Sequence, residues 1–105
     1  MDKKTNYIVE NYIDCVLKIQ PDLIAAYIFG SYAKNKQSTD SDIDIALVID
    51  NLTDINRFDT QVKLMILASK IDNRIEPHLI SKQDLHSNHP FVNEVTKTGI
   101  QLKIR

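Results

Sequence analysis

Two apolar runs separated by a polar segment most constrain what this chain can fold into. The first, at residues 23–29 (LIAAYIF), ends abruptly at Gly30 and Ser31, and the second follows Asp42 and continues to about residue 50. Apolar runs of this length that are bounded by turn residues are typical of buried strands. The sequence therefore predicts a strand, a turn, an exposed loop at residues 35–41 and a second strand.

Asp42 and Asp44 lie two residues apart where the second strand is expected to begin. Because successive side chains of a strand point to opposite faces, both carboxylates project from one face, and Ile43 and Ile45 from the other. Neighbouring carboxylates repel each other, and a divalent cation with oxygen ligands is the usual compensation. Taken alone, two carboxylates at the start of a strand are more often simply exposed to solvent. Separated from Ser31 by ten residues, the pair predicts a metal site.

The Gly30-Ser31 pair is the second feature with chemical meaning. Glycine lets the backbone approach an anion closely or take a left-handed conformation, and serine adds a hydroxyl. Residues 32–36 can then begin a short helix whose first amides point at the same anion. Taken alone, the pair would be a plain turn, because it has neither the Walker pattern nor that of a nucleophile elbow. Beside the aspartates, it predicts a phosphate-binding turn.

The remaining elements alternate between helices and strands. Apolar spacing predicts a helix at residues 5–20 and another at 54–71, the latter capped by Thr53 or Asp54. A third strand is expected at residues 73–80, with Pro77 placing it at an edge. A helical turn at 81–86, a helix at 90–98 and a strand at 100–104 complete an α/β domain of residues 1–105. The side of the second helix that should face the core carries Ile55, Phe58, Val62, Met65, Ile66 and Leu67.

Composition excludes several classes of function. The 105 residues carry a net charge of -1 with a pI near 6.3, so no basic field indicates a nucleic-acid partner. Cys15 is the single cysteine, which excludes an internal disulfide. No apolar run approaches the ~20 residues of a membrane span, and no signal-like segment opens the chain. We therefore expect a cytoplasmic protein without a membrane partner.

Gly30-Ser31, ten residues and Asp42-x-Asp44 together resemble the signature of the DNA polymerase β-like nucleotidyltransferases, and among them the minimal nucleotidyltransferase (MNT) domains of antitoxin type. The likeness extends over roughly residues 26–104. It implies an α/β (α+β) nucleotidyltransferase fold, in which helices back a small, mixed, mostly antiparallel sheet and the active site lies on the open face.

The resemblance also implies roles for individual residues. Asp42 and Asp44 would bind two Mg²⁺ ions, and Gly30 and Ser31 would hold the terminal phosphates of ATP. Lys34 would add a positive charge at a position where relatives often carry arginine.

The family has a third acidic residue on a later strand, and Glu76 is the choice here. It would complete a metal site or act as a base, although an ion pair with Arg74 or His78 is the alternative. Arg74, Glu76 and His78 share one face of the third strand. Because His78, His86 and His89 lack zinc spacing, surface or capping roles are expected for each.

The implied function is transfer of AMP from ATP to a hydroxyl of a partner. MNT domains of this size resemble antitoxins whose partner is a HEPN-domain ribonuclease toxin with an acceptor tyrosine. A chain this small needs a partner or a second subunit, as in a homo-oligomer, to present the acceptor. Two alternatives stay open. One is a non-catalytic, nucleotide-sensing antitoxin that neutralises its toxin by binding alone, and the other is nucleotidyl transfer to a small molecule such as an aminoglycoside.

Overall fold

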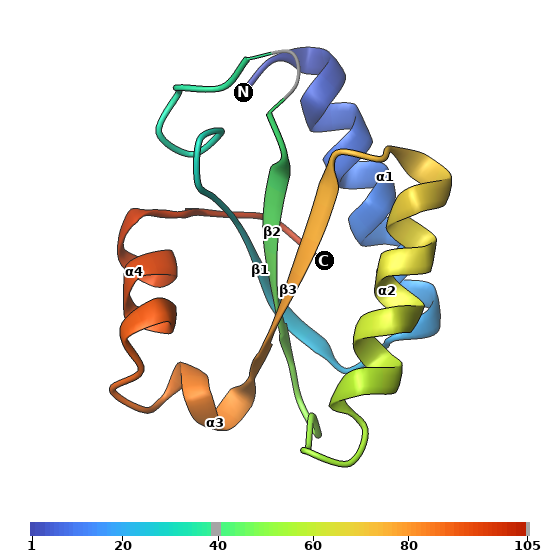
Figure 1. The fold of residues 1–105 in the computed structure, drawn as a ribbon, viewed down its shortest axis with the longest axis vertical. Helices are drawn as coiled ribbons and strands as arrows, with labels where there is room; N and C mark the ends of the chain where they lie inside the picture. The colour runs from blue at the N-terminus through green and yellow to red at the C-terminus, as the bar shows by residue number, and fades with distance from the viewer. Residues whose placement is uncertain (39–40, 105) are drawn as a thin grey trace.

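The computed structural model describes residues 1–38 and 41–104, and its helices and strands alternate much as the apolar spacing predicts (Figure 1). The elements in chain order are α1 (Lys3–Ile19), β1 (Leu23–Phe29), β2 (Ile43–Ile49), α2 (Arg57–Ile71), β3 (Ile75–Ser81), α3 (Lys82–Leu85), α4 (Pro90–Thr98) and β4 (Ile100–Gln101). The bounds of β1 and β2 lie within one residue of the expected strands.

The four strands form one sheet in the order β3-β2-β1-β4. β1 pairs antiparallel with both β2 and β4, whereas β2 and β3 are parallel and are joined through α2. The expected mixed, mostly antiparallel sheet is therefore confirmed. β2 lies between β1 and β3, so residues at its start are close to the end of β1 and to the start of β3.

Helices cover both faces of the sheet (Figure 1). α1 and α2 lie side by side on one face, where Tyr12 and Leu64 pack with Ile43 and Ile45. On the other face, residues of α4 pack with the strand residues Ala25, Ala46, Val48 and Ile80. Because alternate residues of β2 point to opposite faces, Asp44 is on the face of Ala46 and α4.

The side of α2 that faces the core differs from the expected one. Thr60, Leu64 and Ala68 are buried, while most of the predicted apolar set lies on the solvent side. The exposed members and their exposed fractions are Ile55 94%, Phe58 75%, Val62 37%, Met65 50% and Ile66 52%. The prediction was wrong because α2 carries apolar residues on both sides, so spacing alone does not select one. Contacts with β3 and α1 select the side of Leu64, whose carbonyl accepts a buried hydrogen bond of 2.9 Å from the Tyr12 hydroxyl.

The expected capping of α2 is also corrected. Asn56, rather than Thr53 or Asp54, occupies the N-cap position. The Asn56 side chain accepts a hydrogen bond from the Thr53 amide at 2.8 Å, and the Asn56 amide donates to the Thr53 hydroxyl at 3.3 Å. This reciprocal pair fixes a turn before the helix and delays its start to Arg57.

β3 is an edge strand, as Pro77 predicts. Side chains of α2 cover two carbonyls on this strand: Gln61 donates to the Pro77 carbonyl at 3.0 Å, and Arg57 donates to the Leu79 carbonyl at 3.3 Å. Proline and these contacts leave few backbone groups available for pairing with another chain. In the described part of the chain, the helices are too short or too polar to span a bilayer.

Candidate active site

Strand register brings the candidate site residues together at one end of the sheet. Asp44 of β2 lies opposite Phe29 at the end of β1, and on its other side it lies next to Glu76 of β3. The backbone of Gly30 follows Phe29 directly. Three segments far apart in the sequence, at residues 29–31, 42–44 and 76–78, therefore meet at the start of the central strand.

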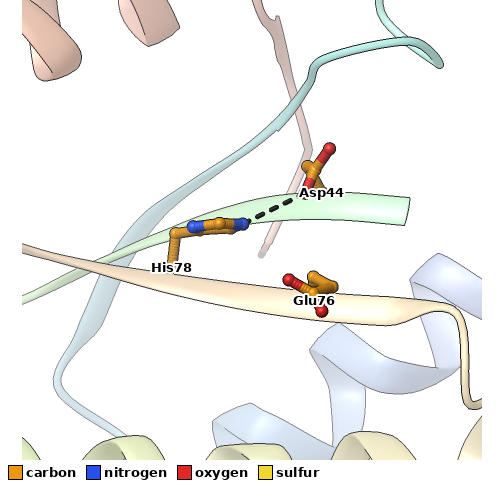
Figure 2. A group of neighbouring side chains, drawn as sticks. All are labelled: Asp44, Glu76 and His78. Carbon is orange, nitrogen blue, oxygen red and sulfur yellow. Dashed lines mark hydrogen bonds and ion pairs between the residues drawn. The ribbon is translucent and has the colours of Figure 1, made fainter. Parts of the chain in front are cut away.

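Asp44, Glu76 and His78 form a compact group of possible metal ligands (Figure 2). One ligand atom from each of these side chains lies within 4.8 Å of the others. Within the group, His78 Nε2 and Asp44 Oδ1 are 3.1 Å apart, at hydrogen-bonding distance. Glu76 is exposed on the edge strand, and Asp44 and His78 are half-buried. The group is thus accessible from solvent and rich in negative charge.

Gly30 takes a left-handed conformation, one of the two reasons that the sequence offered for a glycine here, with φ at +74°. A Cβ atom added at Gly30 would lie 2.6 Å from Asp44 Oδ2, closer than real Cβ contacts. The left-handed backbone therefore favours glycine here, and a Cβ atom would force the Asp44 carboxylate to shift. Asp44 has one oxygen against His78 and the other over the backbone of Gly30.

Asp42 lies one residue before β2 and is exposed. Its position two residues before Asp44 agrees with the predicted shared face, yet Asp42 is outside the group that Asp44, Glu76 and His78 form. The Ile43 amide donates to the Arg74 carbonyl at 2.7 Å and fixes the start of β2 beside β3. The role of Asp42 as a second metal ligand stays a prediction.

Comparison with known proteins identifies the family. Residues 11–105 match the family model described as "Polymerase beta, Nucleotidyltransferase". The chain belongs to this nucleotidyltransferase family. A search of curated proteins finds no match.

Solved structures similar to this nucleotidyltransferase include toxin-antitoxin complexes. A toxin-antitoxin crystallised with AMP-PNP matches at 35% identity and a TM-score of 0.59, covering 90% of this chain and 72% of that one. A complex of a tri-AMPylated Shewanella oneidensis HEPN toxin with an MNT antitoxin matches at 30% identity and a TM-score of 0.57, covering 92% of this chain and 71% of that one. The resemblance to MNT domains is confirmed.

A third solved structure supports the fold alone. It is described as a candidate nucleotidyltransferase from Sulfolobus solfataricus, and it matches at 22% identity with a TM-score of 0.63. The alignment covers 92% of this chain and 86% of that one.

The grouped side chains fit a divalent cation by their chemistry. Two carboxylates and an imidazole are all metal ligands, and their spacing allows one ion to reach an atom of each. Carboxylates on adjacent strands repel each other, so a cation between Asp44 and Glu76 would stabilise the arrangement.

His78 is the member of the group that sequence reasoning missed. We expected a surface or capping role for it, but its ring lies against Asp44 and packs edge-on to Phe29, with ring centroids 4.9 Å apart. The signal was present, because His78 shares a strand face with Glu76. The contact of His78 with Asp44, however, depends on the parallel register of β3 with β2, which the sequence does not show.

Arg74 and His78, the two residues considered as ion-pair partners of Glu76, pair with other carboxylates. Arg74 pairs with Asp72 at 3.1 Å and also donates to the Tyr32 hydroxyl, and His78 pairs with Asp44. The Arg74 guanidinium holds the pKa of the Asp72 carboxyl below its ordinary value. The carboxylate of Glu76 faces solvent next to Asp44, which is where a third acidic ligand would have to be.

The segment after Gly30 folds differently from the short helix expected at residues 32–36. It forms consecutive turns, in which the Lys36 amide donates to the Ser31 carbonyl at 2.9 Å. Asn35 takes a left-handed conformation with φ at +56°, which is incompatible with a continuing helix. Ser31 is half-buried beside Gly30, and Lys34 is exposed. Their predicted contacts with phosphates therefore depend on turn amides and side chains, without a helix N-terminus.

Proposed function

We propose that this chain transfers AMP from ATP to the tyrosine hydroxyl of a HEPN-domain toxin and acts as the antitoxin of that pair. The observation that carries the proposal is the meeting of Gly30, Asp44 and Glu76 at one end of the sheet in a member of the nucleotidyltransferase family. In this geometry a glycine turn that can hold phosphates lies directly against carboxylates that can hold a cation.

The reaction proposed is a displacement at the α-phosphorus of ATP. The hydroxyl oxygen of the acceptor forms a bond to this phosphorus, the bond to the β-phosphate bridging oxygen breaks, and pyrophosphate leaves. Asp44, Glu76 and Asp42 would hold Mg²⁺, which supplies charge stabilisation to the attacking and leaving oxygens when bound. Glu76 would help to hold the ion nearest the acceptor, or take the hydroxyl proton itself.

Gly30, Ser31 and Lys34 would hold the phosphates that leave. Backbone amides near a glycine with positive φ can form a concave anion site, and the Ser31 hydroxyl can donate a further hydrogen bond. Lys34 would contribute as a flexible point charge. These residues would place the α-phosphorus near Asp44 because the Asp44 carboxylate occupies the space where a side chain at Gly30 would begin.

The protein acceptor is supported by the solved structures that this chain resembles. One of them holds a toxin that carries AMP groups together with its MNT antitoxin, and another was crystallised with an ATP analogue. Both are similar to this chain over about nine-tenths of its length. We therefore propose a HEPN toxin as partner in preference to a small-molecule acceptor.

A transfer assay tests the proposal. The chain is incubated with Mg²⁺, ATP labelled at the α-phosphate and the proposed HEPN partner, and label on the HEPN protein is measured. We expect labelling by the native chain and a loss of at least about 100-fold with Asp44→Asn, because the carboxylate stabilises charge in the transition state. Asp14→Asn, an exposed change on α1, is the matched control and should retain full transfer.

The same assay separates the alternative function. If the native and Asp44→Asn proteins neutralise the toxin equally well, and neither of them labels it, the chain acts by binding alone. Glu76→Gln and Asp42→Asn should each lower transfer without weakening the complex. Undiminished transfer in either variant would remove that residue from the catalytic group.

A further inference from the structure

The imidazole of His78 has no role in the transfer as described so far, although it is part of the site. We propose that His78 Nε2 is a direct ligand of the cation that Asp44 and Glu76 hold, and that this nitrogen makes the site bind Mn²⁺ more tightly than Mg²⁺. The inference rests on the proposed function only in placing a cation at these carboxylates. It adds a ligand and a metal preference that the Gly-Ser and Asp-x-Asp pattern does not contain.

The spacing of the three side chains suits one cation. Around an octahedral ion with ligands at about 2.1 Å, neighbouring ligand atoms are about 3.0 Å apart and opposite ones about 4.2 Å. His78 Nε2 and Asp44 Oδ1 are 3.1 Å apart, and the group with Glu76 spans at most 4.8 Å. The hydrogen-bonded proton between the nitrogen and the oxygen can thus be replaced by a metal ion with little movement of either side chain.

Aromatic packing holds the His78 ring in this orientation. Phe29 contacts it edge-on at 4.9 Å between ring centroids, and Phe91 of α4 lies 6.2 Å away. Phe29 and Phe91 also contact each other at 5.5 Å. The His78 side chain nevertheless remains 34% exposed, so the nitrogen is fixed in direction and open to an ion. Figure 2 shows the ring pointing along the sheet toward Asp44.

The imidazole nitrogen of His78 should make the site prefer some divalent cations over others. Mg²⁺ prefers oxygen ligands and keeps several waters, whereas first-row transition ions accept imidazole together with carboxylates. A site of two carboxylates and one imidazole should therefore discriminate in favour of Mn²⁺. Mg²⁺ at higher concentration can still occupy the carboxylates, so the inference does not exclude Mg²⁺-dependent transfer.

The test compares the affinities of the two ions in the absence of ATP. Free Mn²⁺ is measured by electron paramagnetic resonance, and Mg²⁺ by its competition with Mn²⁺, for the native chain and for His78→Gln. Glutamine keeps an amide that can hydrogen-bond to Asp44 but offers the cation only an oxygen. We expect Mn²⁺ affinity to fall about 10- to 100-fold, the range found when groups supporting a metal site are removed, with a smaller change for Mg²⁺. His86→Gln, an exposed histidine after α3, should leave both affinities unchanged.

A second measurement needs no variant of the site. Spin-echo spectra of the native chain with Mn²⁺ should show hyperfine coupling to an imidazole nitrogen, and His86→Gln should retain that coupling. Absence of the coupling, or an equal ratio of Mn²⁺ to Mg²⁺ affinity in native and His78→Gln proteins, would overturn the inference and leave His78 as a hydrogen-bond partner of Asp44. Nitrogen coupling without AMP transfer supports the cation site and contradicts the proposed function. AMP transfer without nitrogen coupling supports the proposed function and contradicts the inference that His78 binds the cation.

Discussion

At the scale of single residues, the geometry of the site depends on one glycine as well as on its charged groups. Gly30 allows the turn after β1 to bring its backbone against the Asp44 carboxylate with a positive φ. An L side chain at this position would be strained and would displace the carboxylate. The Gly-Ser pair is thus informative in the sequence because it marks where the turn backbone comes close to the Asp44 carboxylate.

Gly30→Ala should therefore damage stability and activity together. We expect the free energy of unfolding to fall by roughly 1–2 kcal/mol from the left-handed conformation alone, and AMP transfer to be lost because Asp44 must move. Urea unfolding and the transfer assay measure the two effects. Asn35→Gly, at another left-handed residue of the same turn, is the control and should preserve both. Normal transfer by Gly30→Ala would show that the close approach has no catalytic importance.

The ion pair of Asp72 and Arg74 gives a prediction of pH dependence. Side-chain hydrogen bonds from Arg74 lower the pKa of Asp72 below its ordinary value of 3.8. A carboxyl whose pKa is lowered on folding stabilises the fold above its unfolded pKa, and this stabilisation is lost as the pH falls through the folded pKa. The difference in unfolding free energy between native and Asp72→Asn proteins should be constant near neutral pH and shrink below about pH 4.

Thermal unfolding at a series of pH values measures that difference. Asp14→Asn, at an exposed aspartate of α1, should show a smaller change over the same range. A gap between native and Asp72→Asn proteins that is the same at every pH would mean that the pair does not shift the Asp72 pKa.

At the scale of elements, the strands follow the sequence pattern closely and α2 does not. The runs that predict β1 and β2 are apolar and bounded by Gly30 or by aspartates, so their limits are encoded locally. The side of α2 that is buried is decided by contacts with β3 and with Tyr12, which are remote in sequence. Local spacing could predict that a helix forms here, but not its rotation about its own axis.

Two neighbouring residues of α2 test this correction directly. Leu64 is fully buried, and Met65 is 50% exposed although the apolar spacing placed it in the core. Leu64→Ala should lower the free energy of unfolding by about 2–5 kcal/mol, while Met65→Ala should change it by no more than about 0.5 kcal/mol. Denaturant unfolding of the two variants measures both values. A larger cost for Met65→Ala than for Leu64→Ala would mean that α2 is rotated from the position described.

The site shows the same division between local and remote information. The pattern of Gly-Ser, ten residues and Asp-x-Asp singles out Gly30 and Asp44, whereas Glu76 follows only from the family resemblance, and the roles of all three stay predictions. His78 could not be assigned, because its contact with Asp44 requires the parallel pairing of β2 and β3 in one particular register. The role of Asp42 as a metal ligand stays a prediction. Asp42 is exposed just before β2, and it is not part of the group of Asp44, Glu76 and His78.

At the scale of the whole molecule, the two faces of the sheet carry different kinds of residues. The face covered by α1 and α2 holds most of the buried side chains, including those of Ile43 and Ile45. The opposite face carries Asp44 and His78 at one end, next to the smaller cluster that packs with α4. The alternation of β2 thus lets one strand serve as core and as ligand support at once.

The position of the transferred phosphorus tests the central claim most directly. The native chain and the proposed HEPN partner are incubated with ATP labelled at the α-phosphate in one sample and at the γ-phosphate in another. Nucleotidyl transfer at Asp44 predicts that the partner gains only the α-label, that the γ-label leaves as pyrophosphate, and that Asp44→Asn abolishes the labelling. Gain of the γ-label, or undiminished α-labelling by Asp44→Asn, would contradict the account.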